Sequence, residues 1–204
     1  MGITMYLQQI SLSTLETLEQ FPEQSDLILE LLESVMEMPE SEFYTSAYKE
    51  QFVVEWEKPE LDLQKHFTEI NYFLAGYIEE GSETFRIPEL KGKELDFLVI
   101  NDSKYDGLPL VNLIWYGLPI SKTKCQWLQK PEEVITIKDA LLTISESGFR
   151  ARIQREMVSE YPYPDFMWEE EEFPDWITDY YNQLTYYYCD AAKAYNAMLI
   201  TLSV

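Results

Sequence analysis

The sequence predicts an α+β (mixed α/β) fold, in which residues 1–204 form a single helix-rich domain around a small sheet. Two observations lead to this class. The chain has 204 residues, of which 46% are hydrophobic and 15% aromatic, so it can bury the core of one full domain. Helical periodicity recurs along the chain, whereas strand-like patterns stand at both ends. We therefore expect both terminal strands to be neighbours in the sheet.

The first quarter of the chain predicts two strands and two helices. Residues 2–10 alternate apolar with polar side chains, which indicates a strand. Ser13 and Glu16 form a capping-box pair that marks the start of a short helix. A second helix is expected from Ser25, because its apolar residues fall on one face and its acids on the other. Alternation over 52–56 indicates a further half-buried strand.

The middle of the chain is less regular. Helical spacing of Leu63, Phe67, Ile70 and Leu74 predicts a helix over 61–77, with a glycine near its end. Residues 95–100 predict a buried strand. The stretch 108–120 is apolar but broken by prolines, and it predicts no single type of element.

The last third predicts three helices and a final strand. Pro131 at the first helical position opens a helix that Gly148 closes. A short helix carries Phe149, Ile153 and Met157, and an extended loop follows. A long helix is expected to begin near Pro174 or Asp175, with a broad aromatic face, and the chain ends in an apolar strand over 197–202.

The formal net charge of −22 is concentrated at the two ends of the sequence. No lysine or arginine precedes Lys49, and none lies between Arg155 and Lys193. The second of these base-free segments holds ten acids and eleven aromatic residues. If the terminal strands pair, the two base-free segments should merge into one acidic side of the molecule. The electrostatic field of such an acidic side repels nucleic acid and anionic lipid and attracts basic surfaces.

Several classes of function are disfavoured by the sequence. The longest uncharged run, 107–121, is interrupted by prolines and is shorter than a membrane span, so we expect no membrane association. Gly2 would suit a myristoylated terminus, but Tyr6 stands where serine or threonine is needed. Cys125 and Cys189 have no metal or disulfide spacing, which favours two reduced thiols in a cytoplasmic protein. Neither a phosphate-binding glycine loop nor a basic nucleic-acid surface is present, and no cofactor is expected.

Several segments resemble a known family. The segment from Leu61 to Gly76 is similar to a family segment that reads approximately LDLDKAWxGLHxLLTG, with Leu61, Asp62, Leu63, Lys65, Leu74 and Gly76 in matching places. The start MGITMY resembles the family's MGMxGYF. Residues 131–134, with Ala140-Leu141 and Ile144-Ser145, resemble its PEEV…AL…IS helix. The end, from a Tyr-Pro loop to Ala191-Ala192 and 196–200, resembles its closing segment.

This family is the domain of unknown function 1877, the YfbM-like proteins. The sequence departs from its pattern at Phe67, where the family usually has tryptophan, at Asn71, where it often has histidine, and at Thr4-Met5. Residues 80–120 are not matched by the motifs. The resemblance implies a single-domain α/β fold of bacterial type. It implies no established activity and carries over no catalytic residue.

His66 is the single histidine, so any catalytic triad or histidine-bearing metal site must include it. It lies on a predicted helix, without a nucleophile motif elsewhere and without a cluster of ligand-forming residues in the sequence. A surface or capping histidine is therefore expected. We expect neither a hydrolase triad nor a metal site.

The acidic and aromatic stretch before the last long helix is the candidate partner-binding site, comprising Trp168, Glu169, Glu170, Glu171, Glu172 and Trp176. The glutamates could bind a hard cation, but the alternate-position ligands and central glycine of a calcium loop are absent. A solvated acidic loop before a helix N-terminus accounts for them better. Aromatic residues surrounded by charge are typical of interaction hot spots, although most of these aromatic side chains are expected to pack on the core.

Three functions remain open from the sequence. The first is a non-catalytic protein that binds a basic protein partner, as immunity or inhibitor proteins do. The second is an enzyme with a carboxylate-based or metal-assisted site, which would need a deep pocket with convergent acids. The third is a nucleic-acid mimic. The alternative to all three is that the charge only keeps the protein dispersed.

Overall fold

The computed structural model describes residues 4–20, 60–64, 66–75, 77–80, 83–86, 118–119, 126–153 and 172–203. The helix expected from Ser25, the strands expected at 52–56 and 95–100, and the proline-broken stretch up to residue 117 lie outside these ranges. None of the helices in the described ranges is long and apolar enough to cross a membrane.

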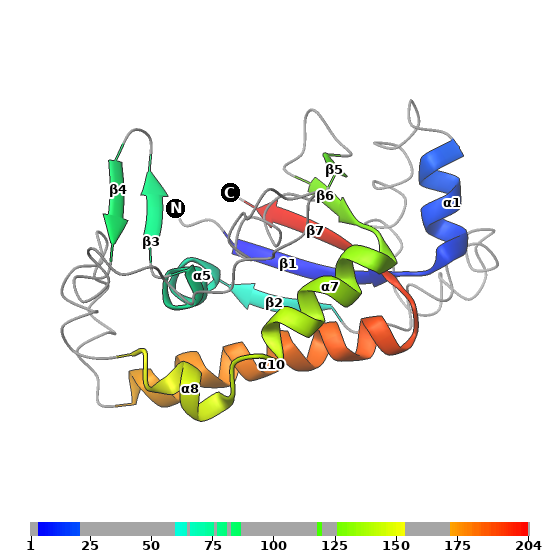
Figure 1. Ribbon diagram of the computed structural model, residues 1–204. Helices are drawn as coiled ribbons and strands as arrows, with labels where there is room; N and C mark the ends of the chain where they lie inside the picture. Colours follow the sequence, from blue (N-terminus) through cyan, green and yellow to red (C-terminus); the bar gives the residue numbers. More distant parts are fainter. Residues whose placement is uncertain are drawn as a thin grey trace, which may run out of the picture.

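The main sheet has five antiparallel strands and places both terminal strands side by side (Figure 1). Its order is β2 (Leu61–Gln64), β1 (Thr4–Ile10), β7 (Ala197–Ser203), β6 (Gln126–Gln129) and β5 (Leu118–Pro119). β1 and β7 pair over seven residues, from Thr4 opposite Ser203 to Ile10 opposite Ala197. The predicted fold class and the predicted pairing of the terminal strands are both confirmed.

The two faces of this sheet are covered by different helices, because side chains alternate along a strand. On one face, Met5 and Leu7 of β1 and Met198 and Ile200 of β7 join the main core. That core includes the buried sides of α5 (Phe67–Ala75), α7 (Pro131–Leu141) and α10 (Phe173–Lys193). On the other face, a second core holds Ile10, Leu128, Ala197 and Leu199 against Leu15 and Leu18 of α1 (Leu12–Gln20).

Helix α10 joins the parts of the main core. Its Tyr181 ring stacks on Phe149 of the short helix α8 (Glu146–Arg150), with ring centroids 4.1 Å apart and planes 6° apart. The Tyr181 hydroxyl donates to the carbonyl oxygens of Leu141, at 2.9 Å, and Ile144, at 3.0 Å. The first of these carbonyls ends α7 and also accepts from the N–H of Ile144, at 3.1 Å, and the second lies in the turn that follows the helix. The long helix predicted to begin near Pro174 is thus confirmed.

Several element boundaries differ from the predictions. Residues 61–64 form strand β2 rather than the start of a helix, because Leu61 and Leu63 are buried while Asp62 and Gln64 are exposed. The helix that opens at Pro131 ends at Leu141, and Gly148 lies inside α8 instead of closing it. The N–H of Gly148 donates to the Ser145 hydroxyl, 3.1 Å away, so a new cap starts this second helix.

Two further predictions are wrong at the level of single elements. Helix α1 begins at Leu12, because the hydroxyl oxygen of Ser11 accepts from the N–H of Thr14 at 3.3 Å and takes the cap position expected for Ser13. The short helix around Phe149 ends at Arg150. Met157, which was expected on it, lies outside the described residues.

The hairpin of β3 (Tyr77–Glu80) and β4 (Glu83–Arg86) is an element that the sequence patterns did not reveal. It stands apart from the main sheet, at the far end of the molecule from α1 (Figure 1). The sequence between its strands, Gly81-Ser82, is typical of a two-residue hairpin turn. This hairpin contains part of the range that the family motifs left unmatched.

The C-terminal end of α10 contains a residue in the left-handed conformation, Tyr195, with φ of 53°. The N–H of Tyr195 donates to the carbonyl of Ala192 and the N–H of Asn196 donates to the carbonyl of Ala191. This is the Schellman arrangement, in which glycine usually takes the position of Tyr195. The Tyr195 hydroxyl donates to the Glu132 carboxylate on α7, which holds the two helices together at this point.

We expect Tyr195→Gly to be more stable than Tyr195→Ala by about 0.5–1 kcal/mol, because alanine keeps the Cβ that disfavours a positive φ. Both variants lack the hydroxyl that binds Glu132, so their difference isolates the backbone effect. Urea unfolding of the two variants measures it. Equal urea midpoints and equal slopes of the free energy of unfolding against urea would show that residue 195 does not hold the left-handed conformation in solution.

Candidate functional site

The candidate site lies at the N-terminal end of α10. Glu172 holds the N-cap position, and its carbonyl accepts from the N–H groups of Asp175 and Trp176, each at 3.1 Å. Of the six predicted partner-binding residues, Glu172 and Trp176 are described and lie one helical turn apart. Trp168, Glu169, Glu170 and Glu171 lie outside the described residues.

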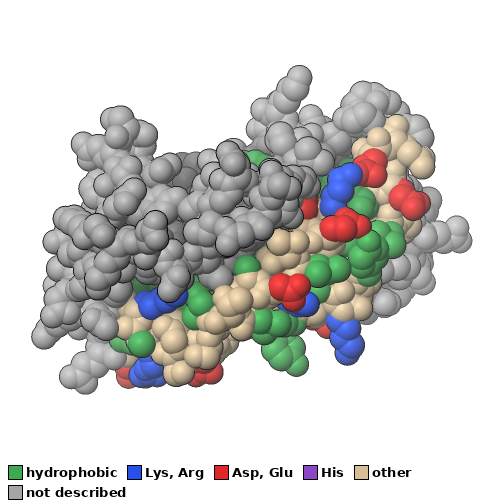
Figure 2. Space-filling view, in the orientation of Figure 1, with side chains coloured by type: hydrophobic (Ala, Val, Ile, Leu, Met, Phe, Trp, Pro, Cys, Tyr) green, Lys and Arg blue, Asp and Glu red, His purple; other side chains and the backbone are tan. Residues whose placement is uncertain are grey.

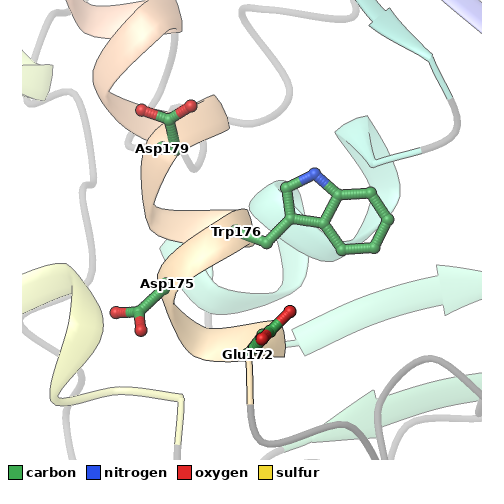
Figure 3. Close-up of a pocket in the computed structure, with 4 residues that line it drawn as sticks. All are labelled: Glu172, Asp175, Trp176 and Asp179. Carbon is green, nitrogen blue, oxygen red and sulfur yellow. The ribbon is translucent and has the colours of Figure 1, made fainter.

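A hollow in the surface adjoins this end of the helix. It has a volume of about 710 Å³ and is lined by Glu172, Asp175, Trp176 and Asp179. Glu172 and Trp176 project to one side of the helix, whereas Asp175 and Asp179 project to another (Figure 3). All four side chains are exposed, so the site is an acidic surface around one tryptophan.

Trp176 rests on two other aromatic rings. The centroid of its indole lies 4.9 Å from the His66 ring and 6.3 Å from the Tyr180 ring, and His66 and Tyr180 are 4.8 Å apart. The indole is nevertheless 38% exposed. Burial raises the pKa of the Tyr180 hydroxyl, and the carboxylate of Asp62 raises it further, so this ring stays neutral. The rings of His66 and Tyr180 therefore hold Trp176 in place while one part of it faces solvent.

The prediction of a surface position for His66 is wrong. The side chain is 7% exposed, because the first turns of α10 cover it with Trp176 and Tyr180. The alternative part of that prediction is confirmed by the backbone. His66 directly precedes α5, and its carbonyl accepts the first bond of that helix from the N–H of Ile70, at 2.9 Å. The buried ring of His66 thus packs against the partly exposed indole of Trp176.

Two of the three acids that line the site have partners within the protein. Arg150 of α8 forms an ion pair with Asp175, and Gln183 donates to Asp179 at 3.0 Å. Both contacts are exposed, so each contributes little to stability. Glu172 and Asp175 also lie where the positive end of the helix dipole favours negative charge. The acids are therefore compatible with the helix terminus without any bound cation.

The described acids do not form a catalytic arrangement. Among the described residues, no group of three or more histidine, cysteine, aspartate and glutamate side chains could hold a metal ion. The carboxylates at the hollow are exposed and point to two sides of α10 (Figure 3). Glu69, the buried acid of α5, receives a hydrogen bond from the neighbouring Thr68 hydroxyl at 3.0 Å. The described carboxylates at the hollow therefore do not converge on one point.

The expected merging of the two base-free segments into one acidic side is not what the described residues show. β1 and β7 do pair, but α1 and α10 pack on opposite faces of the sheet, as their separate cores show. Glu19 of α1 forms an ion pair with Lys130 rather than joining the acids of α10. The face in Figure 2 carries acidic and basic side chains together in its described part. The acidic site is therefore a local feature of α10.

Asp175 and Asp179 were missing from the predicted site, although a signal for them exists in the sequence. Residues three and four positions apart on a helix are neighbours. Once the helix begins at Phe173, Asp179 lies three positions after Trp176 and four after Asp175, so spacing alone places Asp179 beside both. Tyr180 carries the same signal, because it lies four positions after Trp176 on the helix. His66 carries none, because its contact with Trp176 depends on how α5 and α10 pack.

The fold and this surface define a small acidic α+β protein. Its two terminal strands pair with each other inside an open sheet. A family model described as a domain of unknown function (DUF1877) matches residues 1–201. The chain therefore belongs to the DUF1877 family, which confirms the resemblance in its sequence motifs. The crystal structure of YfbM, a protein of unknown function from Escherichia coli, has a similar fold, with a TM-score of 0.55 and 13% sequence identity. The similarity covers 98% of this chain and 99% of YfbM. No curated protein matches the sequence.

Proposed function

We propose that this protein is a non-catalytic acidic protein that binds a basic protein partner, in the manner of an immunity or inhibitor protein. The observation that carries the proposal is the exposed indole of Trp176, held by His66 and Tyr180 and bordered by Glu172, Asp175 and Asp179. Tryptophan and tyrosine side chains dominate the energetics of many interfaces when they are rigid and centrally placed. The aromatic support supplies that rigidity here.

A basic partner suits both components of this surface. Lysine and arginine side chains bind over aromatic rings, and tryptophan is the best of these rings. The neighbouring carboxylates can pair with the same cations or with adjacent ones. The net charge of −22 adds long-range attraction, which raises the rate of encounter with a positively charged protein.

The enzyme alternative would need convergent carboxylates or a metal-binding cluster in a closed pocket. The described part of the chain offers an open hollow with divergent acids instead. A nucleic-acid mimic would need carboxylates arranged with phosphate-like spacing and without an aromatic centre. The tryptophan at the centre of the acids favours a protein surface as the ligand.

We expect the protein to capture a basic partner from an extract of its host at low salt and to release it at high salt. With the captured protein purified, association should slow by about tenfold or more between low and high ionic strength, because exposed charges are screened. Stopped-flow measurement of the intrinsic tryptophan fluorescence follows this rate. If no basic protein is retained at low salt, the proposal is wrong and the charge serves dispersal alone.

Replacing Trp176 with alanine should weaken binding of this purified partner by about tenfold, as expected for an aromatic anchor. Trp176→Phe keeps a ring on His66 and Tyr180 and should lose less. Leu142→Ala is a suitable control, because Leu142 is 56% exposed at the end of α7 and away from the hollow. Isothermal titration calorimetry compares the affinities of the three variants for the partner. Equal affinities would show that Trp176 is not part of the interface.

A further inference from the structure

The outer face of α10 is a continuous exposed strip that runs beyond the hollow. Its members recur every three or four residues and are Glu172, Asp175, Trp176, Asp179, Gln183, Tyr186 and Asp190. The opposite face is buried in the main core through Phe173, Ile177, Tyr181, Leu184 and Tyr188. From Glu172 to Asp190 the strip extends for about 27 Å, at about 1.5 Å per residue.

The strip carries a second aromatic side chain and further negative charge. Tyr186 is 79% exposed, the highest value among the exposed large hydrophobic residues described. Asp190 lies one turn beyond it, and along the helix Lys193 is the first basic residue after the strip. Hydrophobic side chains protrude at the lower edge of the face in Figure 2, where Figure 1 places α10. A tyrosine this exposed contributes little to the core, so its burial is left for a ligand.

We infer that the basic partner docks lengthwise along this strip, with Trp176 and Tyr186 as its two anchors and with Asp179 and Asp190 pairing with its cations. This inference rests on the proposed function and extends its contact area from the hollow to the whole outer face of α10. The occupant is a basic segment of the partner protein, equal in length to about five helical turns. A second copy of this chain is a poor occupant, because it would place like charges opposite one another.

The charge and the hydrogen bonds of the strip support this orientation. Gln183 donates to one oxygen of Asp179, at 3.0 Å, which fixes that carboxylate between the two aromatic residues and leaves acceptor capacity for a cation. Asp190 accepts from the Gln9 side chain of β1 at 3.3 Å and is fixed in the same way. The strip is therefore ordered before any partner arrives, which lowers the entropy cost of binding.

The test uses the intact protein and a synthetic peptide of 18 residues, an amphipathic helix with lysine and arginine on one face and leucine on the other. A scrambled peptide of the same composition is the control ligand. Backbone amide signals in nuclear magnetic resonance spectra should shift along 172–190 when the helical peptide binds. Tyr186→Ala and Asp190→Asn should each weaken its affinity about threefold to tenfold.

Two further variants separate the strip from general electrostatics. Asp139→Asn removes one exposed negative charge on α7, and Leu142→Ala removes an exposed apolar side chain at the end of that helix. Both should bind the helical peptide as the parent protein does. If Tyr186→Ala and Asp190→Asn also bind unchanged while Trp176→Ala is weakened, docking along the strip is wrong and the proposed function stands. If the helical peptide does not bind at low salt, docking along the strip is wrong, and capture from the host extract alone decides the proposed function.

Discussion

Replacing Phe149 with alanine is expected to lower the free energy of unfolding by about 3–5 kcal/mol, the usual cost of deleting a fully buried aromatic ring. Phe149 is completely buried. Its ring stacks on Tyr181 of α10 and meets Phe73 of α5 edge-on, with centroids 6.3 Å apart and planes at 83°. One side chain of a five-residue helix thus joins three helices. Its loss leaves a cavity that α5 and α10 can fill only by moving.

Urea unfolding followed by circular dichroism measures this loss. Phe149→Leu should cost less, because most of the volume is retained. Leu142→Ala should change the free energy of unfolding by no more than about 0.5 kcal/mol, because the Leu142 side chain is exposed. A loss below about 1 kcal/mol for Phe149→Ala would contradict the packing of α8 between α5 and α10.

The longest elements were predictable because their patterns are strong enough to fix them. α10 has a buried face that repeats with helical period over 21 residues, and no other structure buries that face. β1 alternates apolar with polar side chains and β7 is mostly apolar, and each has seven residues near one end of the chain. Two strands of equal length can pair along their whole length, as β1 and β7 do, so their pairing was also predictable.

The short elements were not predictable for a physical reason. In 61–64, Leu61 and Leu63 fit both a strand and the first turn of a helix, and the exposure of Asp62 and Gln64 decides between them only in the folded protein. β6 has four residues and pairs with β7 on one side and β5 on the other. Such a strand is fixed by its neighbours in the sheet, which are distant in sequence.

The residues of the candidate site also divide into predictable and unpredictable ones. Glu172 and Trp176 were predictable because charge and aromatic residues concentrate at one place in the sequence. The burial of His66 was not, since it depends on α10 crossing the start of α5. The merging of the two base-free segments stays a prediction, because most of their acids lie outside the described residues. The described part shows that pairing of β1 with β7 does not determine which face of the sheet a following or preceding helix covers.

The protein is expected to lose stability steeply above pH 10, because buried tyrosines must remain protonated in the folded state. Burial raises the pKa of Tyr188, whose hydroxyl donates to the side-chain oxygen of Gln129 at 2.8 Å. Burial also raises the pKa of Tyr187, with a further contribution from the carboxylates of Glu60 and Asp190. The Tyr187 oxygen accepts from the N–H of Gln9 at 3.0 Å.

The direction follows from proton binding. An unfolded tyrosine releases its proton near pH 10, at about its ordinary pKa, whereas the folded protein retains both protons above that pH. The stabilisation is therefore complete below pH 10 and is lost as the pH rises toward the raised values. Each retained proton contributes a slope of about 1.4 kcal/mol per pH unit, so the two tyrosines together contribute about 2–3 kcal/mol per unit. Urea unfolding at steps between pH 9 and 12 measures this slope.

Two phenylalanine variants, two residues apart on opposite faces of α10, test the assignment. Tyr188→Phe removes one of the two protons and should reduce the slope by about 1.4 kcal/mol per pH unit. At neutral pH it should also cost about 1–3 kcal/mol, because buried Gln129 loses its donor. Tyr186→Phe removes an exposed hydroxyl and should leave the slope as it is. A slope that does not change in Tyr188→Phe would mean that this hydroxyl reaches solvent. The contact between α10 and β6 would then be looser than the fold described above requires.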